Sequence, residues 1–367
     1  TNRFIKTTTD PEGLVTTNNT YHNIYGLVTS QTNPFGQTTQ TVFDFWGKQT
    51  KVTDFLGKSI TYTYTKNGGR IKILQTGDDQ SESFIEQDFL AREVRKGNKD
   101  FNGNWNYITT EYDNYGRKSR ISEPYSLNES PTQWTTTEYD DYSRPIKATT
   151  YNGLTIVSTE PTMTKSKTLN ANEQVIVATD TPGGNIYYKY DASGNMIESD
   201  YDGIKMSITY DNWGRKESLI DTSMGTYNYT YDPFGQLKTE TSPKGVTSYE
   251  YDTFGKTIRK SIQGKTTADF TNIVLTYTYD PVNKWLKNIS VANPNDGNSN
   301  YAYSYDPVTK QLNKTIETLN AIGSSTIVAT FTKELVFDLF GRVSKEISTA
   351  SAFSKSSAKT ITYNYKN

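Results

Sequence analysis

The sequence contains no cysteine, one histidine and four methionines among its 367 residues. Without cysteine the chain can form no disulfide, thiolate nucleophile or cysteine metal site. A catalytic triad or an imidazole metal site would have to include the one histidine, His22. Long apolar runs are also missing, and stretches such as Ile273-Val274-Leu275 are the longest kind present. We therefore expect no cofactor, no membrane span and no signal-peptide core.

Charge of one sign is not in excess either. The 39 basic and 40 acidic residues are interspersed and give a formal net charge of −1. No basic stripe stands out, so a nucleic-acid partner is not expected. Hydrophobic residues make up only 33%, yet aromatic residues reach 13%, with 28 Tyr and 15 Phe. Disordered chains lack aromatic and β-branched residues, whereas these residues suit a pleated, half-buried surface. The composition therefore predicts a β-rich chain.

A short motif recurs along the chain: an aromatic residue, Asp, two variable residues, Gly, and then Arg, Lys, Gln or Asn. In its clearest stretch, Asp191, Asp211, Asp232 and Asp252 are separated by 20, 21 and 20 residues. Asp at the first turn position can bond its own backbone, and Gly three residues later accepts a positive φ. We predict structural hairpin turns at Asp44 and Gly47, Asp113 and Gly116, Asp191 and Gly194, Asp211 and Gly214, Asp232 and Gly235, Asp252 and Gly255, and Asp338 and Gly341. Degenerate copies centre on Asp54, Asp88, Asp140, Asp280 and Asp306.

Side chains alternate ahead of the turns, as Tyr227, Tyr229 and Tyr231 do before Asp232. A two-residue period indicates half-buried strands, and a second set of turn signals falls midway between the motif copies. Each unit is therefore expected to be strand, turn, strand and return turn. The stretch 82–96 fits a short helix or a strand. The same alternation is expected to half-bury the last segment, Ile361, Tyr363 and Tyr365.

The string Tyr229-Thr230-Tyr231-Asp232-Pro233-Phe234-Gly235-Gln236 resembles the YD repeat of the Rhs and wall-associated proteins, teneurins and Tc toxin cocoon subunits. The resemblance covers nearly the whole chain, with an irregular region over 1–180 continuous with a regular region over 181–367. It implies an all-β array of antiparallel hairpins that winds into a curved sheet, part of a hollow β-shell. Asp10-Pro11-Glu12-Gly13-Leu14 matches a string of the family's self-cleaving core, but it lies among ordinary repeats. We therefore expect neither that core nor the family's toxin here.

The resemblance implies a non-enzymatic segment of a large Rhs-type protein, secreted or at the cell surface, that encloses or scaffolds a C-terminal toxin or effector. Its implied partners are further repeats and cargo of its own polypeptide, with secretion machinery or surface glycans as additional candidates. A start at Thr1 rather than Met predicts that the segment begins inside a longer chain or after a cleavage. The alternative is an adhesin or carbohydrate-binding module that uses the aromatic face. A glycosidase would need two carboxylates about 5–10 Å apart, and no motif indicates them.

Several residues allow both a chemical and a structural interpretation, and we prefer the structural one. His22 stands where other copies have Asp, so we interpret it as a turn variant rather than a catalytic base. The solitary motif Asp residues favour backbone bonding over calcium. The acidic pairs Asp78-Asp79 and Asp140-Asp141 are interpreted as solvated turn residues. Aromatic residues at the fourth motif position are expected to pack between adjacent turns: Trp46, Tyr115, Trp213, Phe234, Phe254 and Phe340.

Overall fold

The computed structural model describes residues 3–100, 102–126, 129–139, 141, 143, 145–152, 155–158, 164–170, 173–179, 185–266 and 271–365. All regular secondary structure in this part of the chain is β-strand. The strands belong to two antiparallel sheets in which sequence neighbours pair. The exception is β12 (Tyr125–Ser126), which pairs with β10 (Trp105–Tyr112). The prediction of an all-β array of antiparallel hairpins is confirmed.

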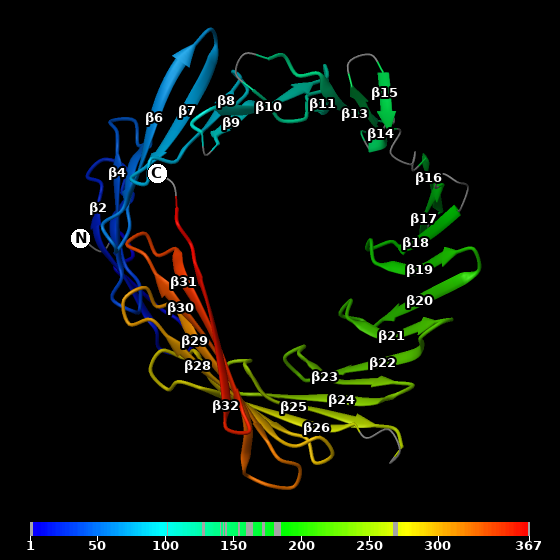
Figure 1. Cartoon of the computed structure of the whole chain (residues 1–367). Helices are drawn as coiled ribbons and strands as arrows, with labels where there is room; N and C mark the ends of the chain where they lie inside the picture. The colour runs from blue at the N-terminus through cyan, green and yellow to red at the C-terminus, as the bar shows by residue number, and fades with distance from the viewer. Residues whose placement is uncertain are drawn as a thin grey trace. The chain divides into compact units, whose positions relative to one another are not determined.

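The first of two compact units combines the two ends of the chain, Thr1–Ser59 and Tyr227–Lys366. Figure 1 shows its early strands in dark blue and its late strands in yellow to red. The strands are β1 (Thr7–Thr9), β2 (Val15–Tyr21), β3 (Val28–Thr32), β4 (Thr38–Phe43), β5 (Gln49–Thr53), β22 (Gly225–Tyr231), β23 (Leu237–Ser242), β24 (Gly245–Tyr251), β25 (Thr257–Gly264), β26 (Asn272–Tyr279), β27 (Leu286–Ala292), β28 (Ser299–Tyr305), β29 (Leu312–Asn320), β30 (Ile327–Phe337), β31 (Val343–Ala352) and β32 (Lys355–Thr362).

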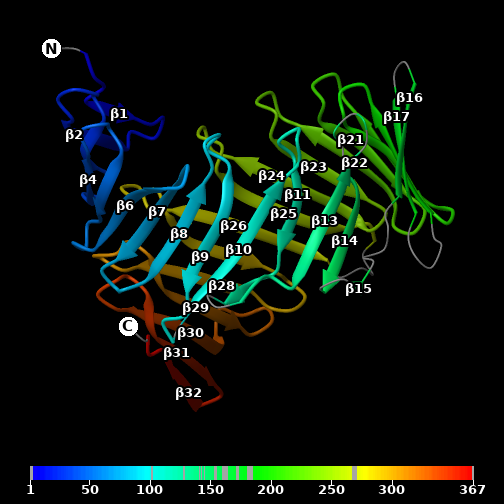
Figure 2. The same ribbon diagram turned by 90° about the horizontal axis from the view of Figure 1, so that it is seen from above.

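The second unit is the middle of the chain, Ile60–Thr226. Its strands from β7 to β14 lie side by side in Figure 2. Besides β10 and β12, the unit contains β6 (Ser59–Asn67), β7 (Arg70–Gly77), β8 (Glu82–Gln87), β9 (Glu93–Lys99), β11 (Lys118–Ser122), β13 (Gln133–Tyr139), β14 (Pro145–Asn152), β15 (Thr155–Ser158), β16 (Thr164–Asn170), β17 (Glu173–Thr179), β18 (Asn185–Asp191), β19 (Met196–Tyr201), β20 (Ile204–Tyr210) and β21 (Lys216–Asp221).

The alternating sequence determines which face of a strand is covered. In β22, Tyr227, Tyr229 and Tyr231 are half-buried, while Asn228 and Thr230 between them are exposed. Tyrosine suits such a surface because its ring can be covered while its hydroxyl reaches water or a partner. The two-residue period thus becomes a tyrosine face and a polar face on each such strand.

A bulge follows each motif turn. Tyr231 pairs with Leu237 but Thr230 pairs with Thr239, so Lys238 is an extra residue on the returning strand. Register shifts of the same kind occur beside the other motif turns, for example between Glu250 and Tyr251. A bulge bends the strand and increases its local twist. The repeated turn therefore imposes a repeated bend on the sheet.

The apolar interior is thin. Among the described residues, the only hydrophobic side chains classed as buried are Phe84, Tyr107 and Ile208. Phe84 lies over Gly97, where an added Cβ would come within 2.6 Å of its ring. Glu86 and Arg95 form a two-pronged ion pair beside this cluster, at 3.0 and 2.8 Å. Stability must therefore come mainly from contacts between neighbouring hairpins rather than from a deep core.

Two local expectations are resolved. The ambiguous stretch 82–96 forms strands, β8 and β9, joined by a turn at Asp88 in which Ala91 takes a φ of 60°. The expectation that Ile361, Tyr363 and Tyr365 are half-buried is wrong, because all three are exposed. The reason is that β32 is the last strand of its sheet and pairs only with β31.

The expected division of the chain near residue 180 stays a prediction, since residue 180 lies outside the described residues. The compact units divide elsewhere, after Ser59 and before Tyr227. Within the described part of the chain, no helical segment is long and apolar enough to cross a membrane.

Substitution of the turn glycine tests the backbone argument. Gly214 has a φ of 76°, and nothing lies within 4 Å of a Cβ built there. Gly214→Val should lower the free energy of unfolding by about 1–3 kcal/mol, because a β-branched residue is strained at positive φ. Gly214→Asn, which tolerates this conformation, should lose clearly less. Chemical denaturation of both variants measures the difference in free energy of unfolding. Equal losses in the two variants would contradict the conclusion that the positive φ of residue 214 makes glycine necessary there.

Candidate functional site: the motif turns and their contacts

The motif aspartate builds the turn with its side chain. Asp211 Oδ1 accepts hydrogen bonds from the backbone N–H of Trp213 and of Arg215, both at 2.9 Å. The carbonyl of Asp211 accepts the N–H of Gly214 at 2.9 Å, and its own N–H donates to the Arg215 carbonyl at 2.8 Å. One carboxylate thus satisfies two backbone donors that a tight turn would otherwise leave unpaired.

The same arrangement recurs at every predicted full copy of the motif. The glycines of these copies all have φ between 73° and 88°. Equivalent side-chain bonds to the backbone are made by Asp44, Asp113, Asp191, Asp232, Asp252 and Asp338. The glycines are Gly47, Gly116, Gly194, Gly214, Gly235, Gly255 and Gly341.

Degenerate copies reach similar turns with other residues. Asp54 and Asp88 bond their backbone in the standard way. Asp280 and Asp306 begin turns that are one residue longer, in which Lys284 and Lys310 take the positive φ. Asp140 lies outside the described residues.

Besides the turn at Asp10, the motif search missed two turns of this type, at Asn33 and at Asp100. A search that accepted Asn for Asp and dropped the preceding aromatic residue would have found both, because Gly36 and Gly103 keep the spacing.

The motif tyrosine joins one copy to the copy before it. Tyr251 donates its hydroxyl hydrogen to the carbonyl of Leu237, at 2.8 Å. Leu237 lies just after the turn of the preceding copy, which begins at Asp232. Burial raises the pKa of Tyr251, which keeps the hydroxyl protonated as a donor. Equivalent bonds are made by Tyr112, Tyr139, Tyr210, Tyr279, Tyr305 and Tyr365.

The basic residue after the glycine connects the aspartate of its own turn to the next tyrosine. Arg117 Nε donates to Asp113 Oδ2 at 2.6 Å, and its guanidinium lies 4.5 Å from the ring centroid of Tyr139. Arg342 bonds Asp338 at 2.8 Å and lies 4.1 Å from Tyr365. Such cation–π contacts stabilise by about 0.5–1 kcal/mol at exposed sites. The motif thus unites a turn, an ion pair and a contact between copies.

Turns far apart in the sequence also meet within the first unit. Lys256 Nζ forms an ion pair with the carboxylate of Glu12. Gln37 Nε2 donates to the carbonyls of Val308 and Thr309, each at 3.2 Å. Both pairs join residues separated by more than 240 positions. These polar contacts connect turns of the N-terminal strands to turns of the C-terminal strands.

An aromatic contact and a cation–π contact join the same two sets of turns. The rings of Phe35 and Trp285 lie 4.6 Å apart, and Lys58 Nζ lies 4.3 Å above the ring of Phe340. The turns meet in sequence order from both sides, because Glu12 contacts Lys256, Phe35 contacts Trp285 and Lys58 contacts Phe340. The two groups of strands are the dark blue and the orange ones in Figure 1. We call this contact the turn zipper: turns 10–14, 33–37 and 54–58 against turns 252–256, 280–285, 306–311 and 338–342.

Most of the fourth-position aromatic residues are not packed between turns. Trp46, Tyr115, Trp213 and Phe234 are between 75% and 91% exposed, and Phe254, although it lies on a zipper turn, is 50% exposed. The packing expectation is wrong for these five residues. Their position is the tip of the turn, which points away from the hairpin body. Phe340 is half-buried because a zipper turn covers it.

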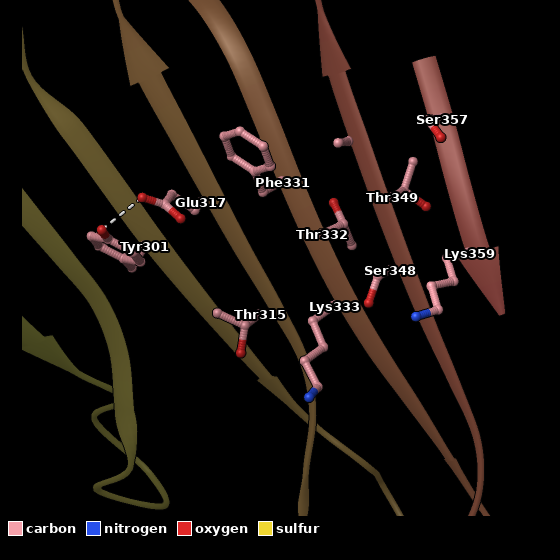
Figure 3. A pocket seen from close by; sticks show the side chains of 11 residues that line it. Tyr301, Thr315, Glu317, Phe331, Thr332, Lys333, Ser348, Thr349, Ser357 and Lys359 are labelled. Carbon is pink, nitrogen blue, oxygen red and sulfur yellow. Dashed lines mark hydrogen bonds between the residues drawn. The ribbon is translucent and has the colours of Figure 1, made fainter. Parts of the chain in front are cut away.

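A shallow hollow of about 480 Å³ opens on the tyrosine face of β28 to β32 (Figure 3). Tyr301 donates its hydroxyl hydrogen to Glu317 at 2.7 Å, and Phe331 is 43% exposed. Lys333 and Lys359 lie on its other side. Short side chains line the rest: Thr315, Thr332, Ser348, Thr349, Ala350 and Ser357. Glu317 is the one carboxylate lining this described hollow, so no carboxylate pair for glycoside hydrolysis forms here.

His22 occupies the aspartate place of a turn. The backbone N–H of His22 donates to the carbonyl of Leu27 at 2.8 Å, and the backbone carbonyl of His22 accepts the N–H of Gly26 at 2.9 Å. Its ring stacks on Tyr25, with centroids 5.3 Å apart. The interpretation of His22 as a turn variant agrees with this geometry.

The acidic pairs show no convergence toward a site. Asp79 Oδ1 accepts hydrogen bonds from the N–H and Oγ of Ser81 within a turn. Asp141 is exposed, and Asp140 lies outside the described residues. Across the described ranges, no group of three or more His, Cys, Asp or Glu residues could hold a metal ion.

These features define a class of protein: an array of tyrosine-aspartate hairpins in which motif tyrosines bond one copy to the copy before it. The Teneurin YD-shell family model matches residues 96–289, more than half of the chain, and the chain belongs to this family. The prediction of a YD-repeat protein is confirmed. No curated protein matches the chain.

Among solved structures, the chain is similar to TcdB2-TccC3 without its hypervariable C-terminal region. The TM-score is 0.56 at 12% identity, with 98% of this chain and 27% of that chain covered. A crystal structure titled TcdB2-TccC3-Cdc42 gives a TM-score of 0.41 at 14% identity, with 97% of this chain and 24% of that chain covered. The Tc holotoxin pore of Photorhabdus luminescens gives 0.37 at 13%, covering 89% and 22%. The first supports the fold, and the chain spans about a quarter of that protein's length.

Removing one motif hydroxyl tests the bond between copies. Tyr251→Phe should lower the free energy of unfolding by about 1 kcal/mol, because the carbonyl of Leu237 loses its partner. Tyr249, on the same strand and face, is the matched control, since no hydrogen bond to its hydroxyl occurs among the described residues. Tyr249→Phe should change stability less in denaturant titrations. A control as costly as the test variant would contradict the assigned bond.

Acid should weaken the turns. Desolvation by burial acts to raise the pKa of Asp211. The backbone N–H groups of Arg215 and Trp213 and the Arg215 guanidinium outweigh it and hold this pKa below its ordinary value. A lowered folded-state pKa means that this stability is complete above the unfolded carboxyl pKa, near 4, and is lost as pH falls through the folded value. The pKa is lowered in the same direction at Asp88, Asp100, Asp113, Asp191, Asp280, Asp306 and Asp338.

Asp211→Asn separates the carboxylate charge from the turn geometry. Asn33 shows that an amide oxygen can accept the same two backbone N–H groups in the equivalent turn. The variant should melt below the wild type above about pH 5, and the gap should close toward pH 2 as the carboxylate is neutralised. Thermal unfolding at a series of pH values measures the gap. A gap that stays constant with pH would show that the carboxylate charge contributes nothing.

Proposed function

We propose that this chain is a wall segment of a large Rhs-type protein, secreted or at the cell surface, and that the wall encloses or scaffolds a C-terminal toxin or effector. Membership of the Teneurin YD-shell family makes the chain a structural shell segment, while the cargo and the location are the proposed parts. The observation that carries the proposal is the recurring hydrogen bond from a motif tyrosine to the preceding copy, exemplified by Tyr251 and Leu237. Such a bond holds one hairpin to the hairpin before it, so the sheet can continue from copy to copy without a second layer packed against it.

A wall role agrees with the use of the acidic residues. The motif carboxylates are engaged with their own backbone, as Asp211 is with Trp213 and Arg215. A general acid or base needs a carboxyl group that is available to a substrate. We therefore propose a non-enzymatic protein without cofactors, whose partners are further repeats and cargo of the same polypeptide. Secretion machinery is a further candidate partner, and nucleic acid is not.

One observation favours the alternative, a carbohydrate-binding or adhesive module. The hollow of Figure 3 combines the rings of Tyr301 and Phe331 with Glu317, Lys333 and Lys359. Rings supply flat apolar area, and the charged groups supply hydrogen-bond partners, the combination that binding sites for polar ligands use.

The shell proposal predicts protection of attached polypeptide. A short unstructured reporter fused after Asn367 should be digested more slowly by a broad-specificity protease than the same reporter fused to an unrelated folded domain. Breaking the turn zipper with Lys256→Glu, which places two carboxylates together at Glu12, should reduce the protection.

Equal digestion in all three fusions would overturn enclosure. Binding of a glycan in an array screen, lost in Phe331→Ala, would instead favour the alternative function, because Phe331 is the exposed ring of the hollow. Circular dichroism of each variant separates these outcomes from unfolding.

A further inference from the structure

The hollow of Figure 3 exists because one strand carries short side chains where a nearby strand carries rings. Two rows of directly paired residues cross the sheet from β28 to β32, and β31 contributes Ala350 and Ser348 to them. To the same two rows β28 contributes Tyr301 and Tyr303. Ala350 lies opposite Phe331, whose ring is left 43% exposed. The resulting space of about 480 Å³ falls within the range of about 300–1,000 Å³ typical of sites for small ligands.

One end of this hollow is basic. Lys333 pairs with Ser348, and Ser348 pairs with Lys359, so the two lysines flank one serine on the same face of the sheet. Neighbouring strands lie about 4.8 Å apart, so the two lysine backbones are about 10 Å apart and both side chains can reach an anion above the serine. Lys333 Nζ forms an ion pair with Glu346 at 3.0 Å. Lys359 has no ion pair among the described residues.

The other end of the hollow carries a carboxylate that is held in place. Tyr301 donates its hydroxyl hydrogen to Glu317 Oε1 at 2.7 Å, and Glu317 lies opposite Phe331. The second oxygen, Glu317 Oε2, has no hydrogen-bond partner within the described part of the chain. An acceptor in this position suits a ligand that brings a hydroxyl group, and it repels a ligand that brings a second acid there. Hydroxyl side chains line the rim between the two ends: Thr315, Thr332, Ser348, Thr349 and Ser357.

The three features together favour one class of ligand. The exposed ring of Phe331 offers a flat apolar surface that suits the carbon face of a sugar ring. Glu317 accepts hydrogen bonds from sugar hydroxyls, while the charge of Lys359 is neutralised by an acidic sugar and not by a neutral one. An acidic polypeptide fits less well, because its carboxylates have no hydrogen to donate to Glu317.

We propose that this hollow binds an acidic oligosaccharide. A sugar carboxylate lies above Ser348, between Lys333 and Lys359. One sugar ring stacks on Phe331, and a hydroxyl group of the same oligosaccharide donates to Glu317. Recognition of an acidic sugar rests on the second function proposed above, carbohydrate binding, and adds the class of sugar to it. The wall function does not depend on it, because the hollow opens on one face of the sheet and takes no part in the bonds between copies.

Calorimetric titration of the full chain with two matched probes tests the proposal. The first probe is an oligogalacturonate, which carries a carboxylate on each sugar, and the second is the same oligosaccharide with its carboxyl groups reduced to alcohols. The wild type should bind the acidic probe about tenfold more tightly than the reduced probe, because only the acidic probe forms charge-assisted contacts with the lysines. Added salt should narrow the difference, since it screens exposed charges.

A pair of lysine variants locates the effect in the hollow. Lys359→Gln should weaken binding of the acidic probe by about fivefold and leave the reduced probe unchanged. The matched control is Lys355→Gln, which removes the same charge from the same strand and face but lies opposite Ala352, outside the hollow. This control should bind both probes as the wild type does. Circular dichroism confirms the fold of each variant, and Lys333→Gln replaces Lys359→Gln should the latter unfold.

Equal binding of the two probes by the wild type, or equal losses in Lys359→Gln and Lys355→Gln, would overturn the recognition of an acidic sugar while carbohydrate binding stands. Failure of the acidic probe to bind would overturn it as well, whereas the carbohydrate-binding function fails only if no glycan of the array binds. A poly-glutamate peptide that binds as tightly as the acidic probe would also overturn it, and would favour an acidic polypeptide as the ligand.

Discussion

The hydrogen bond from a motif tyrosine to the carbonyl after the preceding turn is the interaction on which the rest of the structure depends. Tyr251 and Leu237 give one example, at 2.8 Å. The described chain has few buried hydrophobic side chains, so its strands cannot rely on a second layer for support. The aspartate fixes each turn and the tyrosine fixes that turn to its neighbour. Stability then accumulates along the array, as in other repeat proteins.

Much of this could be predicted from the sequence because its causes are local. Asp211 and Gly214 determine a turn through their own side-chain and backbone preferences, and Tyr227 to Tyr231 alternate because a strand does. The family resemblance rested on the same local string. The stretch 82–96 was ambiguous because short apolar spacing fits both periods, and pairing between neighbouring strands decided it.

The turn zipper could not be predicted, since the meeting of Glu12 with Lys256 depends on bends summed over many bulges. The same lack of long-range information explains the wrong expectation for the turn tips. Trp213 and Phe340 share a motif position, yet only Phe340 has a turn opposite it. The exposure of Tyr363 likewise follows from the absence of another strand beside β32 in this structure, which no spacing rule reveals. The structural shell role follows from the repeat, whose causes are local.

Amide hydrogen exchange tests the central claim most directly. The account predicts that the motif-turn amides of Gly214, Arg215, Gln236 and Lys256 exchange slowly, because each is bonded within a turn that a neighbouring copy supports. The return-turn amides of Ser324 and Thr326, which are bonded only within their own turn, should exchange much faster. Equal exchange in the two kinds of turn would contradict the claim that the motif turns hold the array together.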